Sequence, residues 1–215
     1  MFPSKTRVIA VEGDDGSGKG TVSAFLVKRL SGEGASVLHV GPENLPPFAQ
    51  QIRDIVVGPN LKDTSPDAQA MLFTSYLLNI YDEHIRPNIG KYDYIVIDRT
   101  YLSTLVYQHS SELIRCLEPL LSKHMQVDIL IYLSVTPGVG IERIKERDGG
   151  LDDFERSFTL KQLTERHRLY EELYERVDIP VKHHIDANRT KGDVLVSVWQ
   201  MVSRMCIKEG ITNET

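Results

Sequence analysis

Cysteine is scarce in this sequence, and that scarcity excludes two kinds of structural support. The 215 residues include Cys116 and Cys206, which lie far apart in segments of helical pattern. Neither has a close cysteine or histidine partner at the spacing of a zinc site, and two cysteines cannot build the framework of a disulfide-rich domain. We therefore expect both to be buried thiols in a reducing compartment.

The sequence also lacks a long apolar run and an excess of positive charge. No run approaches the roughly 20 apolar residues of a membrane-spanning helix, and residues 1–6 lack the apolar core of a signal peptide. Twenty-five Lys and Arg residues face 30 Asp and Glu residues, a net charge of -5, whereas general nucleic-acid binders usually present a net basic surface. We expect a cytoplasmic protein that binds neither nucleic acid nor membrane.

Internal repeats, low-complexity tracts and linkers are absent as well, so the length suits a single domain over residues 1–215. Apolar runs predict strands at residues 8–11, 36–40, 94–97, 127–135 and 181–185. Helical spacing predicts helices at residues 21–30, 48–57, 66–86, 102–123, 137–147, 158–176 and 194–207. Strands that alternate with helices favour a parallel sheet with right-handed crossovers.

A glycine-rich stretch between the first strand and the first helix has the spacing of a phosphate-binding loop. Its residues are Gly13, Asp14, Asp15, Gly16, Ser17, Gly18, Lys19, Gly20 and Thr21. In such a loop the backbone N–H groups surround polyphosphate oxygens, the lysine adds positive charge, and the helix N-terminus favours anions. Gly20 stands where a Ser or Thr hydroxyl usually contacts Mg²⁺, so we expect Thr21 to reach the metal indirectly.

A second charged motif, Asp98-Arg99, ends the buried strand predicted at residues 94–97. A carboxylate beside the phosphate loop can hold hydrated Mg²⁺, and the adjacent guanidinium can grip a second phosphate through two hydrogen bonds. The alternative interpretation of an isolated Asp-Arg pair is a strand-end ion pair. The loop and this motif together favour an enzyme that handles two phosphorylated ligands.

Residues 98–108 resemble the Asp-Arg-Tyr-x-x-Ser-x-x-Ala-Tyr-Gln segment of thymidylate kinases, and residues 12–19 match that family's Glu-Gly-x-Asp-Gly-x-Gly-Lys loop. The resemblance runs through nearly the whole chain. It implies an α/β P-loop kinase with a five-stranded parallel sheet flanked by helices and a short lid at about residues 146–156. It also implies Mg²⁺ and ATP as phosphoryl donor, a deoxynucleoside monophosphate as acceptor, most of all dTMP, and a homodimer.

The resemblance assigns roles residue by residue. Lys19 would contact the donor phosphates, Asp15 the sugar 3′-hydroxyl or the metal region, and Arg99 the acceptor phosphate. Phe73 would stack on the acceptor base and Tyr107 would lie beneath the sugar, although both could also be ordinary core residues. The other expected site residues are Arg53, Ser103 and Gln108 around the acceptor, Arg143 and Arg147 for catalysis, and Asp98 with Thr21 for the metal.

The sequence departs from the family pattern in ways that bear on specificity. Leu77 stands where many members carry the arginine that reads thymine, and residues 41–44 and 152–155 each lack a family arginine. Arg143, Lys145 and Arg147 are then the basic candidates on the lid side. These changes leave open a kinase for dUMP, another deoxynucleotide or a nucleoside. They also leave open a nucleotide-binding protein without transferase activity, against which the retained Lys19, Asp98 and Arg99 argue.

Overall fold

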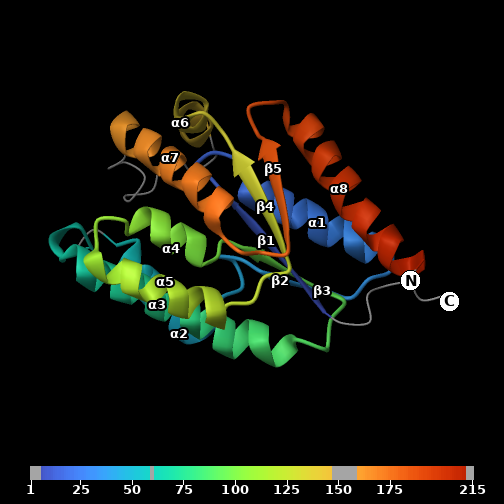
Figure 1. Ribbon diagram of the computed structural model, residues 1–215, viewed down its shortest axis with the longest axis horizontal. Coiled ribbons are helices and arrows are strands. Elements are labelled where there is room, and N and C mark those ends of the chain that lie inside the picture. The colour runs from blue at the N-terminus through green and yellow to red at the C-terminus, as the bar shows by residue number, and fades with distance from the viewer. Residues whose placement is uncertain (1–5, 59–60, 147–158, 212–215) are drawn as a thin grey trace.

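The computed structural model describes residues 6–58, 61–146 and 159–211. Its strands are β1 (Arg7–Gly13), β2 (Val37–Val40), β3 (Tyr94–Asp98), β4 (Ile129–Ser134) and β5 (Val181–Asp186). They form one parallel sheet in the order β2-β3-β1-β4-β5 (Figure 1). The predicted five-stranded parallel α/β sheet is therefore confirmed. Because all strands run the same way, the residues that follow β1 and β3 meet at one edge of the sheet.

Different helices cover the two faces of this sheet. The helices are α1 (Lys19–Gly32), α2 (Pro47–Val56), α3 (Pro66–Ile80), α4 (Tyr101–Tyr107), α5 (Glu112–His124), α6 (Pro137–Glu146), α7 (Leu160–Arg176) and α8 (Lys191–Ile211). Val8 and Ala10 of β1 face a core shared with α3, α4, α5 and α7. Ile9 and Val11 face the opposite core, with α1 and α8 (Figure 1). Side chains alternate along a strand, so a strand covered on both faces reads as a continuous apolar run.

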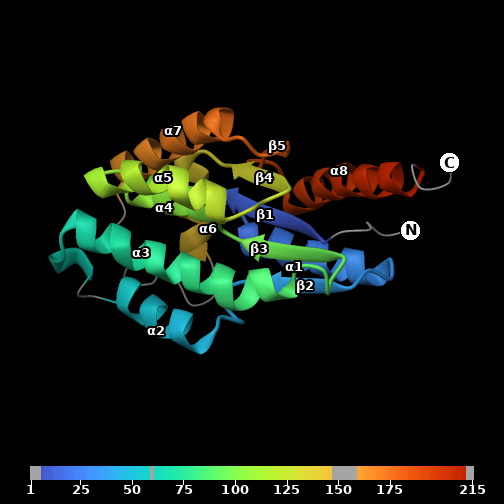
Figure 2. The ribbon, with the colours of Figure 1, turned by 60° about the horizontal axis from the view of Figure 1, so that its bottom comes forward.

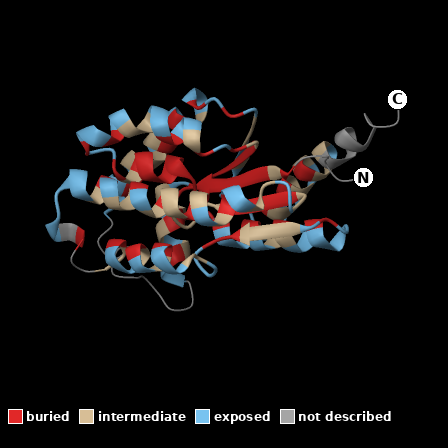
Figure 3. Ribbon diagram, turned by 90° about the horizontal axis from the view of Figure 1, so that it is seen from below, coloured by how far each residue is buried: buried red, intermediate tan, exposed pale blue. Residues whose placement is uncertain are grey.

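The central strands are the most deeply buried part of the molecule, and the outer faces of the helices are exposed (Figure 3). Helix α2 lies outside α3 and packs on it through Ile52 and Val56, which meet Leu72 and Phe73 (Figure 2). This small cluster holds α3 beside the edge of the sheet where β2 and β3 end.

The prediction of one helix over residues 102–123 is wrong, because the segment folds as two helices. Helix α4 ends at Tyr107, and α5 begins at Glu112. At the break the Ser111 N–H donates to the Gln108 carbonyl, and the Ser111 hydroxyl donates to Asp67 at the start of α3. This anchoring lets α4 pack on β1 while α5 packs on α3. A polar run at residues 108–112 interrupts the apolar periodicity here, and Ser111 is a residue type common at the start of a helix, so the sequence did carry a signal of the break.

Cys116 is exposed on α5, so the prediction of a buried thiol is wrong for this residue. The buried positions of α5 are Ile114 and Leu121, two turns apart on one face, and Cys116 lies off that face. The predicted helix at residues 66–86 is α3, followed by a π-helical turn at Tyr81–Ile85. Within the described ranges, no helix combines the length and apolar character needed to span a bilayer.

Candidate active site

The turn from β1 to α1 is packed so closely that two of its glycines have no room for a side chain. A Cβ on Gly13 would lie 2.2 Å from the Leu133 carbonyl oxygen, and one on Gly16 would lie 2.3 Å from the Gly140 carbonyl oxygen. Both glycines also have positive φ angles, of 151° and 78°. The loop thus rests against β4 and the first turns of α6. This support holds the backbone N–H groups of the loop in the fixed arrangement that a polyphosphate needs.

Lys19 is buried inside this loop, with 8% of the residue exposed. Its ammonium group donates to the carbonyl oxygens of Gly13 at 2.9 Å and Asp14 at 2.8 Å. Burial, and then the nearby Arg99 guanidinium, lower the pKa of Lys19 from its ordinary value of 10.5 to about 8, although Asp15 and Asp98 oppose the shift. A bound phosphate would therefore strongly favour the protonated, positively charged form of Lys19.

This pKa predicts how the binding of a polyphosphate depends on pH. Above about pH 8 the empty site loses the Lys19 proton, so the KM for a nucleoside triphosphate should rise by up to about tenfold per pH unit. Bound phosphate raises the pKa of the ammonium, so kcat at saturation should fall only at higher pH. Initial rates from pH 7 to pH 10 measure both parameters. The Lys19→Arg variant, whose guanidinium stays charged over this range, should not show the rise in KM. A wild-type KM that does not change with pH would contradict the assignment of Lys19 to the triphosphate.

A cavity of about 710 Å³ opens over the loop at the carboxyl edge of the sheet. Ligands bind at this edge in open α/β sheets. The expected site residues that line the cavity are Asp15, Gly16, Ser17, Gly18, Lys19, Gly20, Thr21, Arg53, Phe73, Asp98, Arg99, Ser103, Tyr107 and Arg143. Leu77 lines it too, one helical turn beyond Phe73 on α3. The tertiary structure therefore gathers residues from the loop, β3, α2, α3, α4 and α6 around one space.

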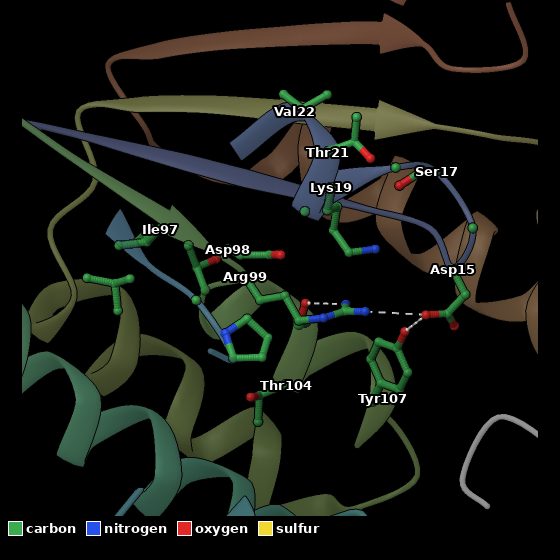
Figure 4. A pocket seen from close by; sticks show the side chains of 18 of the residues that line it. Asp15, Ser17, Lys19, Thr21, Val22, Ile97, Asp98, Arg99, Thr104 and Tyr107 are labelled. Atoms are coloured by element: carbon green, nitrogen blue, oxygen red, sulfur yellow. Dashed lines mark hydrogen bonds and ion pairs between the residues drawn. The ribbon is translucent and has the colours of Figure 1, made fainter. Parts of the chain in front are cut away.

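Asp15 is the centre of the charged cluster in this cavity (Figure 4). Arg99 Nη2 lies 3.3 Å from Asp15 Oδ1, and the Tyr107 hydroxyl donates to the same oxygen. Arg166, from α7, places its Nη1 3.5 Å from Asp15 Oδ2. Burial by itself raises the pKa of Asp15, but Arg99, Lys19, the Tyr107 hydrogen bond and Arg166 bring it below its ordinary value. Asp15 is thus an anion and a ready acceptor for a hydroxyl group.

Arg99 connects this cluster to the end of β3. Its φ angle is 75°, a left-handed conformation that few residues other than glycine adopt. Its Nη1 donates to the Ser103 hydroxyl at 3.1 Å, and its guanidinium carbon lies 5.4 Å from the centre of the Tyr107 ring. The unusual backbone turn carries the guanidinium over α4 and into the cavity. There it can offer two parallel N–H groups to an oxyanion.

Asp98, Gly20 and Thr21 provide the test of the expected metal site. Among the residues that the structure describes, no group donates to the buried Oδ1 of Asp98. A Cβ on Gly20 would lie 3.6 Å from Asp98 Oδ2, so the position that usually supplies the metal-binding hydroxyl does adjoin this carboxylate. Thr21 lines the cavity one residue further on. A carboxylate with an oxygen unpaired within the described residues, near the Thr21 hydroxyl, fits Mg²⁺ held mainly by water and phosphate.

Arg143 lies at the far end of the cavity, against the connection from β5 to α8. Its guanidinium donates to the carbonyl oxygens of Ala187 at 2.6 Å, Asn188 at 3.4 Å and Arg189 at 3.1 Å. These contacts fix α6 to that connection. Arg189 and Lys191 line the same end of the cavity, and sequence reasoning did not select them. The structure thus extends the basic lining well beyond the loop.

Gly13, Asp14 and Gln108, also expected in the site, do not line the cavity. Gln108 is buried at the end of α4. The Asp14 carboxylate turns away, where its Oδ2 accepts from the Val135 N–H at 3.0 Å and contacts His167 Nδ1 at 2.9 Å. Burial raises the pKa of Asp14, and the His167 hydrogen bond works against that rise. Arg147 and residues 147–156 of the expected lid lie outside the described residues.

Sequence reasoning missed two sets of contacts that support the site, those of Glu12 and those of Arg166 and His167. Glu12 is fully buried, and its carboxylate accepts hydrogen bonds from the backbone and hydroxyl groups of Thr100 and Ser103 at the start of α4. Arg166 and His167 reach the loop from α7. Glu12 was visible only as part of the loop motif, and no local pattern distinguishes Arg166 from the other charged residues of its helix. Both contacts depend on where α4 and α7 pack.

Comparisons with known proteins point to one family. The family model described as thymidylate kinase matches residues 11–198. The thymidylate kinase of Buchnera aphidicola is 30% identical over 151 residues, covering 67% of this chain and 71% of that protein. The thymidylate kinase of Xanthomonas euvesicatoria is 29% identical over 191 residues, which is 87% and 79% of the two chains. That of Idiomarina loihiensis is 27% identical over 201 residues, which is 91% and 96%.

Proposed function

Because the chain belongs to the thymidylate kinase family, we propose that it transfers the γ-phosphoryl group of ATP to dTMP, giving dTDP and ADP. The observation that carries this proposal is that Lys19 and Arg99 line one cavity together with Asp15, which pairs with Arg99. A hydrolase would need one phosphate-binding centre. Two such centres suit a donor polyphosphate and an acceptor monophosphate, and the carboxylate beside them suits a sugar hydroxyl.

The residues of the site account for the steps of such a transfer. Lys19 and the loop N–H groups bind the donor phosphates, and Arg99 binds the acceptor phosphate and turns one of its oxygens toward the donor. That oxygen forms the new bond to the γ-phosphorus, the bond from phosphorus to the bridging oxygen breaks, and ADP leaves. Positioning and charge neutralisation suffice, so no covalent enzyme intermediate is needed.

We also propose Mg²⁺ as the metal of the reaction, held through Asp98 and, by way of water, Thr21. Bound Mg²⁺ would neutralise charge on the phosphate oxygens. Asp98 Oδ1 has no hydrogen-bond donor among the described residues, and this supports the assignment. A single-domain homodimer in the cytoplasm completes the proposal, as the family resemblance and the sequence composition imply. Sedimentation at micromolar concentration tests the dimer.

The acceptor sugar should be selected by Tyr107. The ring lines the cavity and its hydroxyl is fixed on Asp15, which supports the proposed place beneath the sugar. A 2′-hydroxyl there would find neither room nor a partner, so the protein should prefer deoxyribonucleotides. Tyr107→Ala should relax the preference by opening space, whereas Tyr107→Phe keeps the ring and should retain most of it. The kcat/KM values for dTMP, dUMP, UMP and dGMP, from coupled ADP release, measure this.

The presence of Leu77 supports dUMP as a second acceptor. This buried apolar side chain lines the cavity where many family members carry an arginine that reads thymine. Loss of one good hydrogen bond changes discrimination by about 1–3 kcal/mol, so dUMP should be used, though less well than dTMP. Adding thymidine to the same panel tests a nucleoside kinase. Preference for a purine monophosphate would overturn the proposed pocket, and no ADP release with any acceptor would favour a binding protein without transferase activity.

A further inference from the structure

Helix α7 contacts the three acidic residues of the loop region with three neighbouring side chains. Arg166 reaches Asp15, His167 reaches Asp14 at 2.9 Å, and the Tyr170 hydroxyl lies 3.4 Å from Glu12 Oε2. The first and last of these α7 residues are four positions apart and therefore share one face of the helix. This face meets the loop at its carboxylates. The contact joins the loop to a helix more than 100 residues away in the sequence.

Arg166 is the member of this face that contacts Asp15 and Tyr107, two residues that line the cavity. Its side chain is 12% exposed, and its guanidinium carbon lies 4.3 Å from the centre of the Tyr107 ring. Asp15 and Tyr107 line the large cavity, but Arg166 does not; it lines a small recess behind them, next to Asp15. It therefore supports two cavity residues from the side opposite the expected substrates.

The two arginines that pair with Asp15 contact different oxygens of its carboxylate and can therefore have different roles. Arg99 and Tyr107 use Oδ1, whereas Arg166 uses Oδ2. A bound acceptor monophosphate would attract Arg99 and stand close to the Asp15 carboxylate, which has the same sign of charge. If Arg99 were the only guanidinium paired with Asp15, the carboxylate and the phosphate would compete for it. A second guanidinium at Asp15, outside the cavity, removes that competition.

We propose that Arg166 is a positioning residue for phosphoryl transfer: it holds the Asp15 carboxylate and the Tyr107 ring in place and leaves Arg99 free to bind the acceptor phosphate. This inference rests on the proposed function of the same site. It adds to that function a residue from α7, beyond the loop and the Asp98-Arg99 motif. Because Arg166 acts through Asp15 and Tyr107, its loss should affect the acceptor far more than ATP.

Arg168 shows what an arginine of the same helix does without this role. Its side chain is 52% exposed and pairs with Glu165 and Glu172 on α7 itself. Pairs of this kind contribute little to stability. Arg168→Ala therefore removes the same charge from the same helix without touching the cavity, and it serves as the matched control.

The first experiment compares Arg166→Ala, Arg166→Lys and Arg168→Ala with the wild type. For Arg166→Ala we expect kcat/KM for dTMP to fall about 10- to 100-fold, mainly through KM, because small misplacements in a site have effects of this size. The KM for ATP should change less than about threefold. The preference for dTMP over the ribonucleotide should weaken, since Tyr107 loses its support. Arg166→Lys should recover part of the loss, and Arg168→Ala should match the wild type.

A double-mutant cycle separates positioning from a general loss of structure. Equilibrium binding of dTMP is measured for the wild type, Asp15→Asn, Arg166→Ala and the double variant. If Arg166 acts through Asp15, its removal should weaken binding much less in the Asp15→Asn background than in the wild type. Additive effects would overturn the proposal, as would equal losses for dTMP and ATP. Should Arg166→Ala fail to fold, Arg166→Gln, which keeps much of the side-chain length, takes its place.

The wild-type assay distinguishes failure of this inference from failure of the proposed function. A wild type that phosphorylates dTMP, together with an Arg166→Ala variant of unchanged KM and unchanged sugar preference, would overturn only the role of Arg166. A wild type that releases no ADP with any nucleotide would overturn both. Thermal unfolding of each variant shows whether a loss of binding comes from loss of the fold.

Discussion

Replacing Lys19 by alanine should leave a folded protein whose turnover is lowered by about 100-fold or more, since removal of one preorganised group at developing charge costs at least that much. The ammonium is the cation inside the phosphate loop, and it is held there by the carbonyl oxygens of Gly13 and Asp14. Its work in the proposed reaction is to stabilise negative charge on the donor phosphates. The fold should survive because the loop keeps its packing on β4 and α6.

Turnover is measured at saturating ATP and dTMP, together with the melting temperature. Lys28→Ala is the matched control, because Lys28 is exposed on the same helix, α1, and removes the same charge away from the cavity. Its turnover should equal that of the wild type. An unchanged turnover number in folded Lys19→Ala would show that the loop does not bind the reacting phosphates.

Arg99→Lys should raise the KM for the acceptor monophosphate by about tenfold or more while leaving the KM for ATP nearly unchanged, because an ammonium cannot reproduce the two-donor grip of a guanidinium. The structure gives Arg99 a second reason for this effect. Its guanidinium reaches Ser103 and Asp15 at the same time, and one ammonium group cannot hold both in that geometry. The positive φ angle is unfavourable for lysine as it is for arginine, so the backbone should stay as it is.

The two KM values are obtained from initial rates with each substrate varied in turn. Arg115→Lys, at an exposed position of α5, controls for the chemical change alone and should behave as the wild type. Equal increases in both KM values would place Arg99 at a site shared by the two nucleotides. No increase in either would remove it from the substrates altogether.

The family assignment and the sheet were accessible from the sequence because their signals are local. A phosphate loop is built from nine consecutive residues, 13–21, and its function requires those glycines and that lysine in one short stretch. Strands buried on both faces, such as β3 and β4, appear as continuous apolar runs and end at the edge of the sheet where ligands bind. The cavity accordingly contains most of the expected residues, among them Phe73 and Tyr107.

Tertiary structure alone decided which charged residues meet. At the break after Tyr107 the Ser111 hydroxyl donates to Asp67 on α3, a contact between separate helices that helical periodicity does not report. Asp14 and Asp15 are adjacent in the sequence, yet one faces His167 and the other the cavity. Arg166 joins the site because α7 packs on α4. Local propensity and periodicity report which side of an element is buried. Which residue of another element a side chain contacts depends on how the separate elements pack together.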